Sequence, residues 1–255
     1  MVRNLLVLEV LVSFGVLNAQ PPSYTAADIV NASDYSAGPF APNSVLSIFG
    51  SNLSWDTATY TLQAGQAALP TELASVQVGV DEWQAPLLYV SPSQINFLVP
   101  STETSGSAVV RVVREGVAGP PVTVTLVAGA PALFSTTAGF AIATHLDGSP
   151  LTDASPGQAG EFVVVYATGL GVTSPNPAPG EIPTEAAEIQ LFGSLNVSLN
   201  GAALPALLVS YAGVTPGYAG LYQLNIRLPQ GVPADPVIQV SVGTQSSGSL
   251  KLAAQ

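Results

Sequence analysis

The chain has 255 residues, enough for two domains that each bury a core of their own. Hydrophobic residues make up 47% of it and charged residues only 8%, a composition that excludes disorder caused by a lack of apolar side chains. Sixteen acidic residues against five basic ones give a net charge of −11, which repels phosphate backbones, so we expect no nucleic-acid partner. Because there is no cysteine, disulfides and cysteine-bound metals are excluded.

The N-terminus is typical of a secretory signal peptide. Arg3 precedes an apolar stretch over residues 5–17, and Ala19 offers a cleavage site before Gln20. The stretch is shorter than the ~20 residues that a membrane-spanning helix needs, and Gly, Pro or charge interrupts every later apolar run. We therefore expect residues 1–19 to be removed and the protein to be secreted or to reside at the cell exterior or in the periplasm, with no membrane span.

The rest of the chain alternates short apolar runs with turn residues. A Pro-, Ser- and Ala-rich lead-in over residues 20–42 precedes a first domain over residues 43–134. A connecting segment, residues 135–160, carries a hairpin at Asp147-Gly148, and a second domain covers residues 161–255. Strands are predicted at Val45–Phe49, Val76–Val80, from Leu87, and at 95–99, 108–113, 122–127 and 161–166. Two polar excursions, residues 54–72 and 172–188, separate strands in the two domains. Strands at this spacing predict an all-β protein of two tandem immunoglobulin-like β-sandwiches.

The two domains share a sequence pattern. Residues 48–53 align with 165–170, residues 78–91 align without a gap with 197–210, and residues 94–100 align with 223–229. The order of the blocks is the same in both halves, which indicates a tandem duplication. The copies differ in two places: Trp83 stands against Ala202, and residues 211–222 stand against Pro92-Ser93. Shared blocks are predicted to be scaffold, and a local function is expected where the copies differ.

Several segments together resemble one family. They are Ile29-Val-Asn-Ala32, the strand end at 47–53, the long block 85–100, Ala130-Pro-Ala-Leu-Phe134, Tyr166-Ala-Thr-Gly-Leu-Gly171 and residues 216–225. In this order they resemble the Solibacter-type C-terminal domain of exported acidobacterial proteins, over residues 28–255. Each half also resembles an IPT/TIG immunoglobulin-like domain through Phe49–Leu53. The resemblance implies tandem β-sandwiches on an exported protein. It assigns no activity to the chain. One position departs from the family pattern, since His145 stands where an asparagine-like residue is expected.

Aromatic side chains are the main candidates for ligand binding. Trp83 is predicted at a hairpin tip, and Tyr211 and Tyr218 lie in the predicted inserted loop; each could stack on a sugar ring or anchor a protein contact. The alternative is that Trp83 covers the neighbouring domain and that the loop fills the seam between the domains. Tyr222, beside the strand that starts at Gln223, is expected in the core.

Catalytic and metal chemistry have little support in this sequence. His145, the only histidine, lies in a predicted turn, and there is no Gly-x-Ser-x-Gly motif. Neighbouring acids (Asp81 with Glu82, Glu181 with Glu185) would serve a carboxylate-based hydrolase only if they faced each other across a cleft. Asp147 and Asp153 form a weak calcium candidate without the EF-hand spacing. We therefore assign no catalytic residue, no metal and no cofactor.

These observations predict a secreted, non-catalytic binding or adhesion module whose partner is an extracellular protein or glycan. One alternative is a carbohydrate-binding module that uses Trp83 and the 211–222 loop. Another is a structural spacer or assembly domain.

Overall fold

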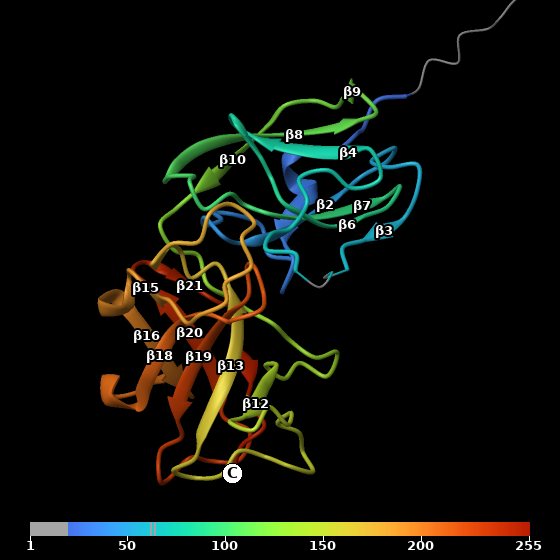
Figure 1. Ribbon diagram of the computed structural model, residues 1–255. Helices are drawn as coiled ribbons and strands as arrows, with labels where there is room; N and C mark the ends of the chain where they lie inside the picture. The colour runs from blue at the N-terminus through green and yellow to red at the C-terminus, as the bar shows by residue number, and fades with distance from the viewer. Residues whose placement is uncertain (1–19, 62, 64) are drawn as a thin grey trace, which may run out of the picture.

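The computed structural model describes residues 20–61, 63 and 65–255, so the predicted signal peptide lies outside it. The described residues form two β-sandwiches, one stacked on the other (Figure 1). They contain no α-helix; their helices are the three single 3-10 turns η1 (Ala26–Asp28), η2 (Phe192–Ser194) and η3 (Ala206–Leu208). None of these is long and apolar enough to cross a membrane.

The first sandwich packs two five-stranded sheets face to face. One sheet has the order β1 (Ile29–Asn31), β2 (Val45–Phe49), β7 (Gln94–Leu98), β6 (Leu87–Val90), β3 (Ala58–Thr59). The other has the order β10 (Val122–Leu126), β8 (Gly106–Arg114), β4 (Val76–Val80), β5 (Trp83–Gln84), with β9 (Val117–Ala118) also on β8. Side chains of β4 and β10 alternate between buried and less buried positions, the pattern of strands that face the core on one side.

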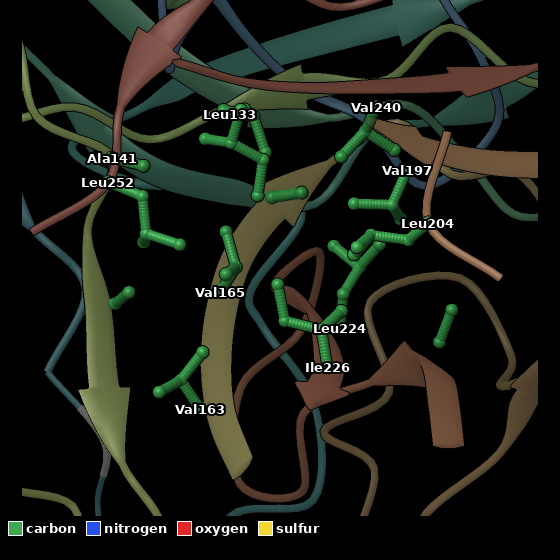
Figure 2. Packing of buried hydrophobic residues seen from close by; sticks show 14 of the residues in the cluster. Leu133, Ala141, Val163, Val165, Val197, Leu204, Leu224, Ile226, Val240 and Leu252 are labelled. Carbon is green, nitrogen blue, oxygen red and sulfur yellow. The ribbon is translucent and has the colours of Figure 1, made fainter. Parts of the chain in front are cut away.

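The second sandwich repeats this arrangement. Its larger sheet has the order β11 (Ala132–Leu133), β13 (Phe162–Thr168), β19 (Tyr222–Arg227), β18 (Val209–Val214), β15 (Glu188–Ile189), β14 (Thr173–Ser174), with β12 (Ala143–His145) also on β13. The smaller sheet has the order β17 (Ala202–Ala203), β16 (Leu195–Leu199), β20 (Val237–Val242), β21 (Gln245–Ser246), with β22 (Leu250–Lys251) also on β20. Figure 2 shows Val165 and Leu224 of one sheet in the same core as Val197 and Val240 of the other. The predicted fold of two tandem immunoglobulin-like sandwiches is confirmed.

Strand register shows how the two halves correspond. Ile48 pairs with Ile95, and Val165 pairs with Leu224, so the aligned blocks 48–53/165–170 and 94–100/223–229 occupy equivalent places. Side chains repeat as well: Gln94 donates to Asn96 Oδ1 at 2.9 Å, and Gln223 donates to Asn225 Oδ1 at 3.0 Å. This repeated hydrogen bond explains why the Gln-x-Asn pattern occurs in both copies.

The gapless alignment of 78–91 with 197–210 is wrong in its second part. Both hairpins match, because Val80 pairs with Trp83 and Leu199 pairs with Ala202. In the following strand, however, Tyr89 pairs with Asn96 while Tyr211 pairs with Asn225, each beside a register shift. The equivalent of Tyr89 is therefore Tyr211, three positions beyond the residue that the sequence match gives. The three residues of η3 account for this shift.

The segments that the sequence predicts to precede and connect the domains are strands and core of the sandwiches. In the lead-in 20–42, β1 pairs with β2, and Tyr24, Ile29 and Phe40 are buried in the first core. In the connecting segment 135–160, β12 pairs with β13, and Ala141, Ala143 and Leu151 are buried in the second core. The structure thus differs from the predicted boundaries, because the sandwich that a short strand joins is decided by its pairing partner, which lies elsewhere in the chain.

Register also makes His145 the counterpart of Asn31. Ile29 pairs with Ile48 in one half and Ala143 pairs with Val165 in the other, so the third residue of each strand is equivalent. The turns that follow are alike, since Asn31 N donates to Ser36 O and His145 N donates to Ser149 O. The residues before these strands are also equivalent. Ser23 forms a β-bridge with Ser51, and Ala132 pairs with Thr168, which is the counterpart of Ser51. Each repeat therefore starts before its predicted first strand.

Candidate functional site

Backbone and side-chain hydrogen bonds join the two sandwiches along a seam. Thr168 Oγ1 accepts from Val45 N at 3.1 Å and itself donates to Gly220 O at 3.0 Å. The two polar excursions meet here, because Leu69 N donates to Gly180 O and Ile182 N donates to Ala67 O, both at 2.8 Å. Segments predicted to be separate irregular excursions thus form one contact. This contact fixes the two domains against each other.

The true insertion of the second repeat crosses this seam. Residues 213–222 stand where the first repeat has only 91–93, since the flanking strand residues are equivalent. Gly220 has φ +77°, and a Cβ at this position would overlap Leu98 and Val45 of the first sandwich. Gly217 N donates to Pro183 O at 2.7 Å. The loop is therefore held from both sides, and it presents Tyr218 with 61% of its surface exposed.

Two neighbouring hollows flank Tyr218, and we call them together the seam groove. The larger, of about 520 Å³, lies between the sandwiches; its lining residues are Ala32, Val45, Tyr60, Leu69, Leu88, Asn96, Phe134, Ile182, Gly217, Tyr218, Ala219, Gly220 and Leu221. The smaller, of about 390 Å³, is lined by Phe134, Ile142, Tyr166, Thr215, Tyr218 and Leu221. Both volumes fall in the range of small-molecule sites. None of the lining residues carries a charge.

Each hollow has one lining residue whose hydroxyl group is buried and lacks a hydrogen-bond partner within the described part of the chain. Tyr60 is among the lining residues of the larger hollow and Thr215 among those of the smaller. Their hydroxyl oxygens, Tyr60 Oη and Thr215 Oγ1, are buried without a hydrogen-bond partner among the described residues. Thr215 as a whole is 7% exposed. Such a group costs on the order of 1–3 kcal/mol of stability when nothing satisfies it. The lining of the seam groove is thus mostly apolar, and two of its residues each keep a buried hydroxyl without a partner in the part of the chain that the structure describes.

Tyr211 lies in strand β18, and its hydroxyl contacts backbone carbonyls. The prediction that it belongs to the inserted loop is wrong, because β18 runs through Val214 and Tyr211 has its counterpart in Tyr89. Its hydroxyl is in hydrogen-bonding contact with Val214 O at 2.8 Å and Ala187 O at 3.1 Å. Burial raises the pKa of this phenol. Tyr222 is fully buried, as predicted, and donates to Gly171 O; burial also raises its pKa.

Trp83 lies apart from the seam groove. It is the first residue of β5, directly after the turn of the β4–β5 hairpin, and 41% of its surface is exposed. Neither hollow of the seam groove includes it. The structure therefore does not bring Trp83 and Tyr218 together. A second exposed tryptophan, Trp55, was not singled out from the sequence; its ring lies 3.7 Å from the guanidinium carbon of Arg114, and its Nε1 donates to Glu115. No pattern in its polar excursion marks Trp55.

His145 sits between a serine and a glutamate, a triad-like order that the sequence does not show. Its Nδ1 lies 2.5 Å from Glu161 Oε1, and its Nε2 lies 3.2 Å from both Ser155 O and Ser155 Oγ. The hydrogen bond that His145 Nδ1 donates to the Glu161 carboxylate, together with the contact of Nε2 with the carbonyl of Ser155, raises the pKa of His145. Burial alone would raise the pKa of Glu161, but hydrogen bonds from His145 and Gln158 lower it.

This arrangement favours a charged imidazolium over a general base. In the protonated ring, which the raised pKa of His145 favours, both nitrogens donate, and Nε2 then has no lone pair with which to take a proton from Ser155 Oγ. The groups that could form an oxyanion hole are also occupied: Ser155 N donates to Thr152 O, and Pro156 has no N–H. The cluster therefore ties β12 to the start of β13.

The acidic candidates occupy three separate places. Glu181 and Glu185 line one hollow of about 260 Å³, but Glu181 Oε2 accepts from Ala178 N at 2.8 Å. Asp81 Oδ1 accepts from Val109 N at 2.7 Å. Asp147 Oδ1 accepts from Ser149, and Asp153 is exposed. In the described part of the chain no three His, Cys, Asp or Glu residues are grouped so as to hold a metal ion.

One acid that the sequence did not suggest has a perturbed titration. Burial, together with the charges of Asp81 and Glu82, raises the pKa of Glu103. Glu103 lines a further hollow of about 390 Å³, which includes neither Asp81 nor Glu82.

Comparison with known proteins yields distant likenesses only. No family model matches the chain, and no curated protein sequence does. A surface glycan-binding protein of Prevotella bryantii aligns at 13% identity over 91% of this chain and 41% of its own, with a TM-score of 0.28. The SGBP-B protein of a xyloglucan utilization locus in Bacteroides uniformis aligns at 10% identity over 92% and 50%, with a TM-score of 0.26. A titin fragment aligns at 12% identity over 92% and 100%, with a TM-score of 0.25. The chain spans half or less of the length of the two bacterial proteins. Likenesses at such TM-scores carry no argument about a ligand.

Proposed function

We propose that this chain is an exported, non-catalytic binding module whose ligand occupies the seam groove. The observation that carries the proposal is the placement of Tyr218: it is exposed, it flanks two uncharged hollows, and it stands on the segment that only the second repeat has. A loop fixed on a rigid β-framework loses little conformational entropy on binding. The absence of catalysis in this proposal is supported by the contacts of the acids and of His145. Asp81 and Glu181 accept from backbone amides, and His145 pairs with Glu161.

Export is proposed on the signal-peptide pattern of residues 1–19. Membership of the Solibacter-type family is likewise proposed, with the block 85–100 as its main support. Mass spectrometry of the protein recovered outside the expressing cell tests the first point, and an N-terminus at Gln20 is expected. Recovery of the uncleaved chain from the cytosol alone would contradict export.

The binding proposal is tested by comparing Tyr218→Ala with Tyr35→Ala, a matched control that removes another exposed tyrosine, 63% exposed and outside the seam groove. Both variants and the unaltered protein are assayed by biolayer interferometry against panels of polysaccharides and extracellular proteins. Loss of a ligand with Tyr218→Ala alone supports the seam groove. If a ligand instead loses its binding to Trp83→Ala, the site lies at the hairpin tip. If no ligand binds at all, the spacer alternative is favoured.

A further inference from the structure

We infer that the open edge of β10 in the first sandwich binds an extended peptide segment of a partner protein, which adds a strand to the sheet beside Thr123. This site is separate from the seam groove, because no residue lines both. Three observations carry the inference: backbone groups without a partner at this edge, a chain segment on the equivalent edge of the second repeat, and a hollow beside the open edge.

The backbone N–H and C=O of Thr123 point away from their own sheet. Thr123 pairs with Val109 on β8, and both backbone groups of Val109 are bonded to Asp81 on the opposite side. Thr123 and Val109 therefore form a pair without hydrogen bonds to each other, and the groups of Thr123 are directed to the free edge. Among the described residues neither group has a hydrogen-bond partner, and Thr123 is exposed.

The chain covers only the far end of this edge. Phe40 N donates to Thr125 O at 3.0 Å, and Val127 N donates to Phe40 O at 2.8 Å, so Phe40 lies parallel to the end of β10. In the structure as described, none of residues 20–39 is hydrogen-bonded to β10. The edge beside Thr123 is therefore open.

The second repeat has the same edge in β22. Val122 of β10 and Leu250 of β22 are equivalent, because their partners on β8 and β20 pair in turn with equivalent residues of β4 and β16. A parallel bridge lies four residues beyond Val122 and beyond Leu250, which supports this match. Thr123 and Lys251 are the next residues of the two strands, so they correspond.

On this second edge the chain supplies an extended segment of its own. Lys251 N donates to Gly139 O at 3.2 Å, and Ala141 N donates to Lys251 O at 2.7 Å, so both backbone groups of Lys251 are bonded. Phe140, between them, pairs with Lys251 in parallel. In the first repeat the corresponding residues form the turn η1, which makes no such bonds to Thr123. The same position is thus filled in one repeat and open in the other.

The turn η1 leaves a hollow beside the open edge. Thr25 N and Thr25 Oγ1 both donate to Asp28 Oδ2, at 2.8 and 2.7 Å, and these bonds hold the segment in its turn. The hollow has a volume of about 320 Å³ and is lined by Ala26, Ile29 and Phe40 together with the edge of β10. None of its lining residues is charged. It can therefore take an apolar side chain of a segment that pairs with the edge.

The edge also lacks the features that prevent strand addition. Natural edge strands carry charged residues, proline or bulges for this purpose. The second repeat has Lys251 at this position, whereas residues 122–126 contain no charge and no proline and pair with β8 without a register shift. Strand addition by a peptide combines main-chain hydrogen bonds with a pocket for a side chain, and this edge offers both.

The filled edge of the second repeat indicates which segment fits. The residue beside Thr123 corresponds to Phe140, and the next one corresponds to Ala141, which is buried in the second core. The bound segment is therefore expected to have a large apolar residue followed by a small apolar one, whose side chain enters the hollow. The net charge of −11 favours a segment without acidic residues.

The test uses a synthetic peptide with the sequence of residues 136–144 and the full chain after removal of any leader. Amide hydrogen exchange is followed by NMR with and without the peptide at about 1 mM. Exchange at Thr123 is expected to slow about threefold or more, because its N–H gains an acceptor. The amide of Lys251, whose edge is already filled, is the internal control and is expected not to change. A Thr123 amide that stays unprotected would overturn the inference.

Two N-methylated peptides separate strand pairing from other contacts. Methylation of the nitrogen that corresponds to Ala141 removes the donor to Thr123 O and is expected to abolish the slowing. Methylation of the nitrogen that corresponds to Phe140 is the matched control and is expected to retain it, since Phe140 N donates to Thr136 Oγ1 rather than to Lys251. Equal effects of the two methyl groups would contradict the backbone pairing.

Two further outcomes would also overturn the inference. If Tyr218→Ala abolishes peptide binding, the peptide occupies the seam groove, and the proposed function stands without the edge site. If Thr123 is protected without the peptide and the protection grows with protein concentration, a second copy of the chain already fills the edge.

Discussion

The two sandwiches share a framework and differ in what is attached to it. In both hairpins a side-chain oxygen accepts from the equivalent backbone amide of the neighbouring strand. Asp81 accepts from Val109 N, and Asn200 accepts from Val237 N, each at 2.7 Å. Yet the second repeat spans the seam with residues 213–222, whereas the first closes the equivalent turn with 91–93. Duplication has thus kept the strands and left the turns free to diverge, and the seam groove with the exposed Tyr218 arises at the divergent turn.

The largest expected difference concerns the residue that ends the two turns. Tyr222 is fully buried, while its counterpart Ser93 is exposed. Tyr222→Ala is expected to lower the free energy of unfolding by about 3–5 kcal/mol, because it leaves a large cavity and an unpaired carbonyl at Gly171. Urea denaturation measures this. Ser93→Ala, the control, is expected to stay within about 0.5 kcal/mol, and a similar loss in both would contradict the asymmetry.

A buried arginine distinguishes the first sandwich from the second. Arg114 is 1% exposed and donates to Asn52 O and to Gln20 O, whereas Val242 holds the equivalent position. Arg114→Met is expected to cost about 1.5–3 kcal/mol of unfolding free energy, since it removes charge-assisted hydrogen bonds. Arg111→Met, on an exposed site of the same strand, is the control for thermal or urea unfolding. An equal effect of the two variants would refute a specific role of Arg114.

His145→Asn converts the second repeat to the residue of the first. The His145–Glu161 pair is partly exposed, at 16% and 26%, so its loss is expected to cost at most about 1 kcal/mol. The raised pKa of His145 contributes stability below its unfolded value of about 6.5 that disappears as the pH rises through the folded value. The lowered pKa of Glu161 contributes stability above about 4.5 that disappears as the pH falls.

The difference in unfolding free energy between the unaltered protein and His145→Asn should therefore be largest between about pH 4.5 and 6.5. Urea denaturation at a series of pH values measures it. A difference that grows above pH 8 would contradict the ion pair.

The smallest effect is expected at the hairpin tips. Trp83→Ala gives the first repeat the residue that the second has at Ala202, and Trp83 is 41% exposed. The melting temperature should change little, with a free-energy difference within about 0.5 kcal/mol. A large loss would mean that the indole packs against the sandwich, and Ala202→Trp gives the reciprocal measurement.

A strand that carries its own periodic pattern can be predicted from the sequence. Val76, Val78 and Val80 alternate in the sequence, and they are buried in β4. The sequence misplaced Tyr211, because chance identities in the gapless alignment (Pro86 with Pro205, Leu88 with Leu207, and Val90-Ser91 with Val209-Ser210) lie three residues away from the true register. Only the pairing of Tyr211 with Asn225 and of Tyr89 with Asn96 corrects it. Of the predicted ligand residues, Tyr218 lies in the seam groove and Trp83 lies at the β4–β5 hairpin. Tyr211 lies within β18, where its hydroxyl contacts backbone carbonyls.

The sequence by itself determined the all-β class, the duplication and most strand positions, because period-2 burial and turn residues are local properties of the chain. It could not determine the seam groove. That groove combines Tyr60 and Asn96 of the first sandwich with Phe134 and Tyr218 of the second, and no spacing rule links residues so far apart. Tertiary structure decided this site because docking the two sandwiches selects which side chains meet, and the inserted turn then fixes Tyr218 at their junction.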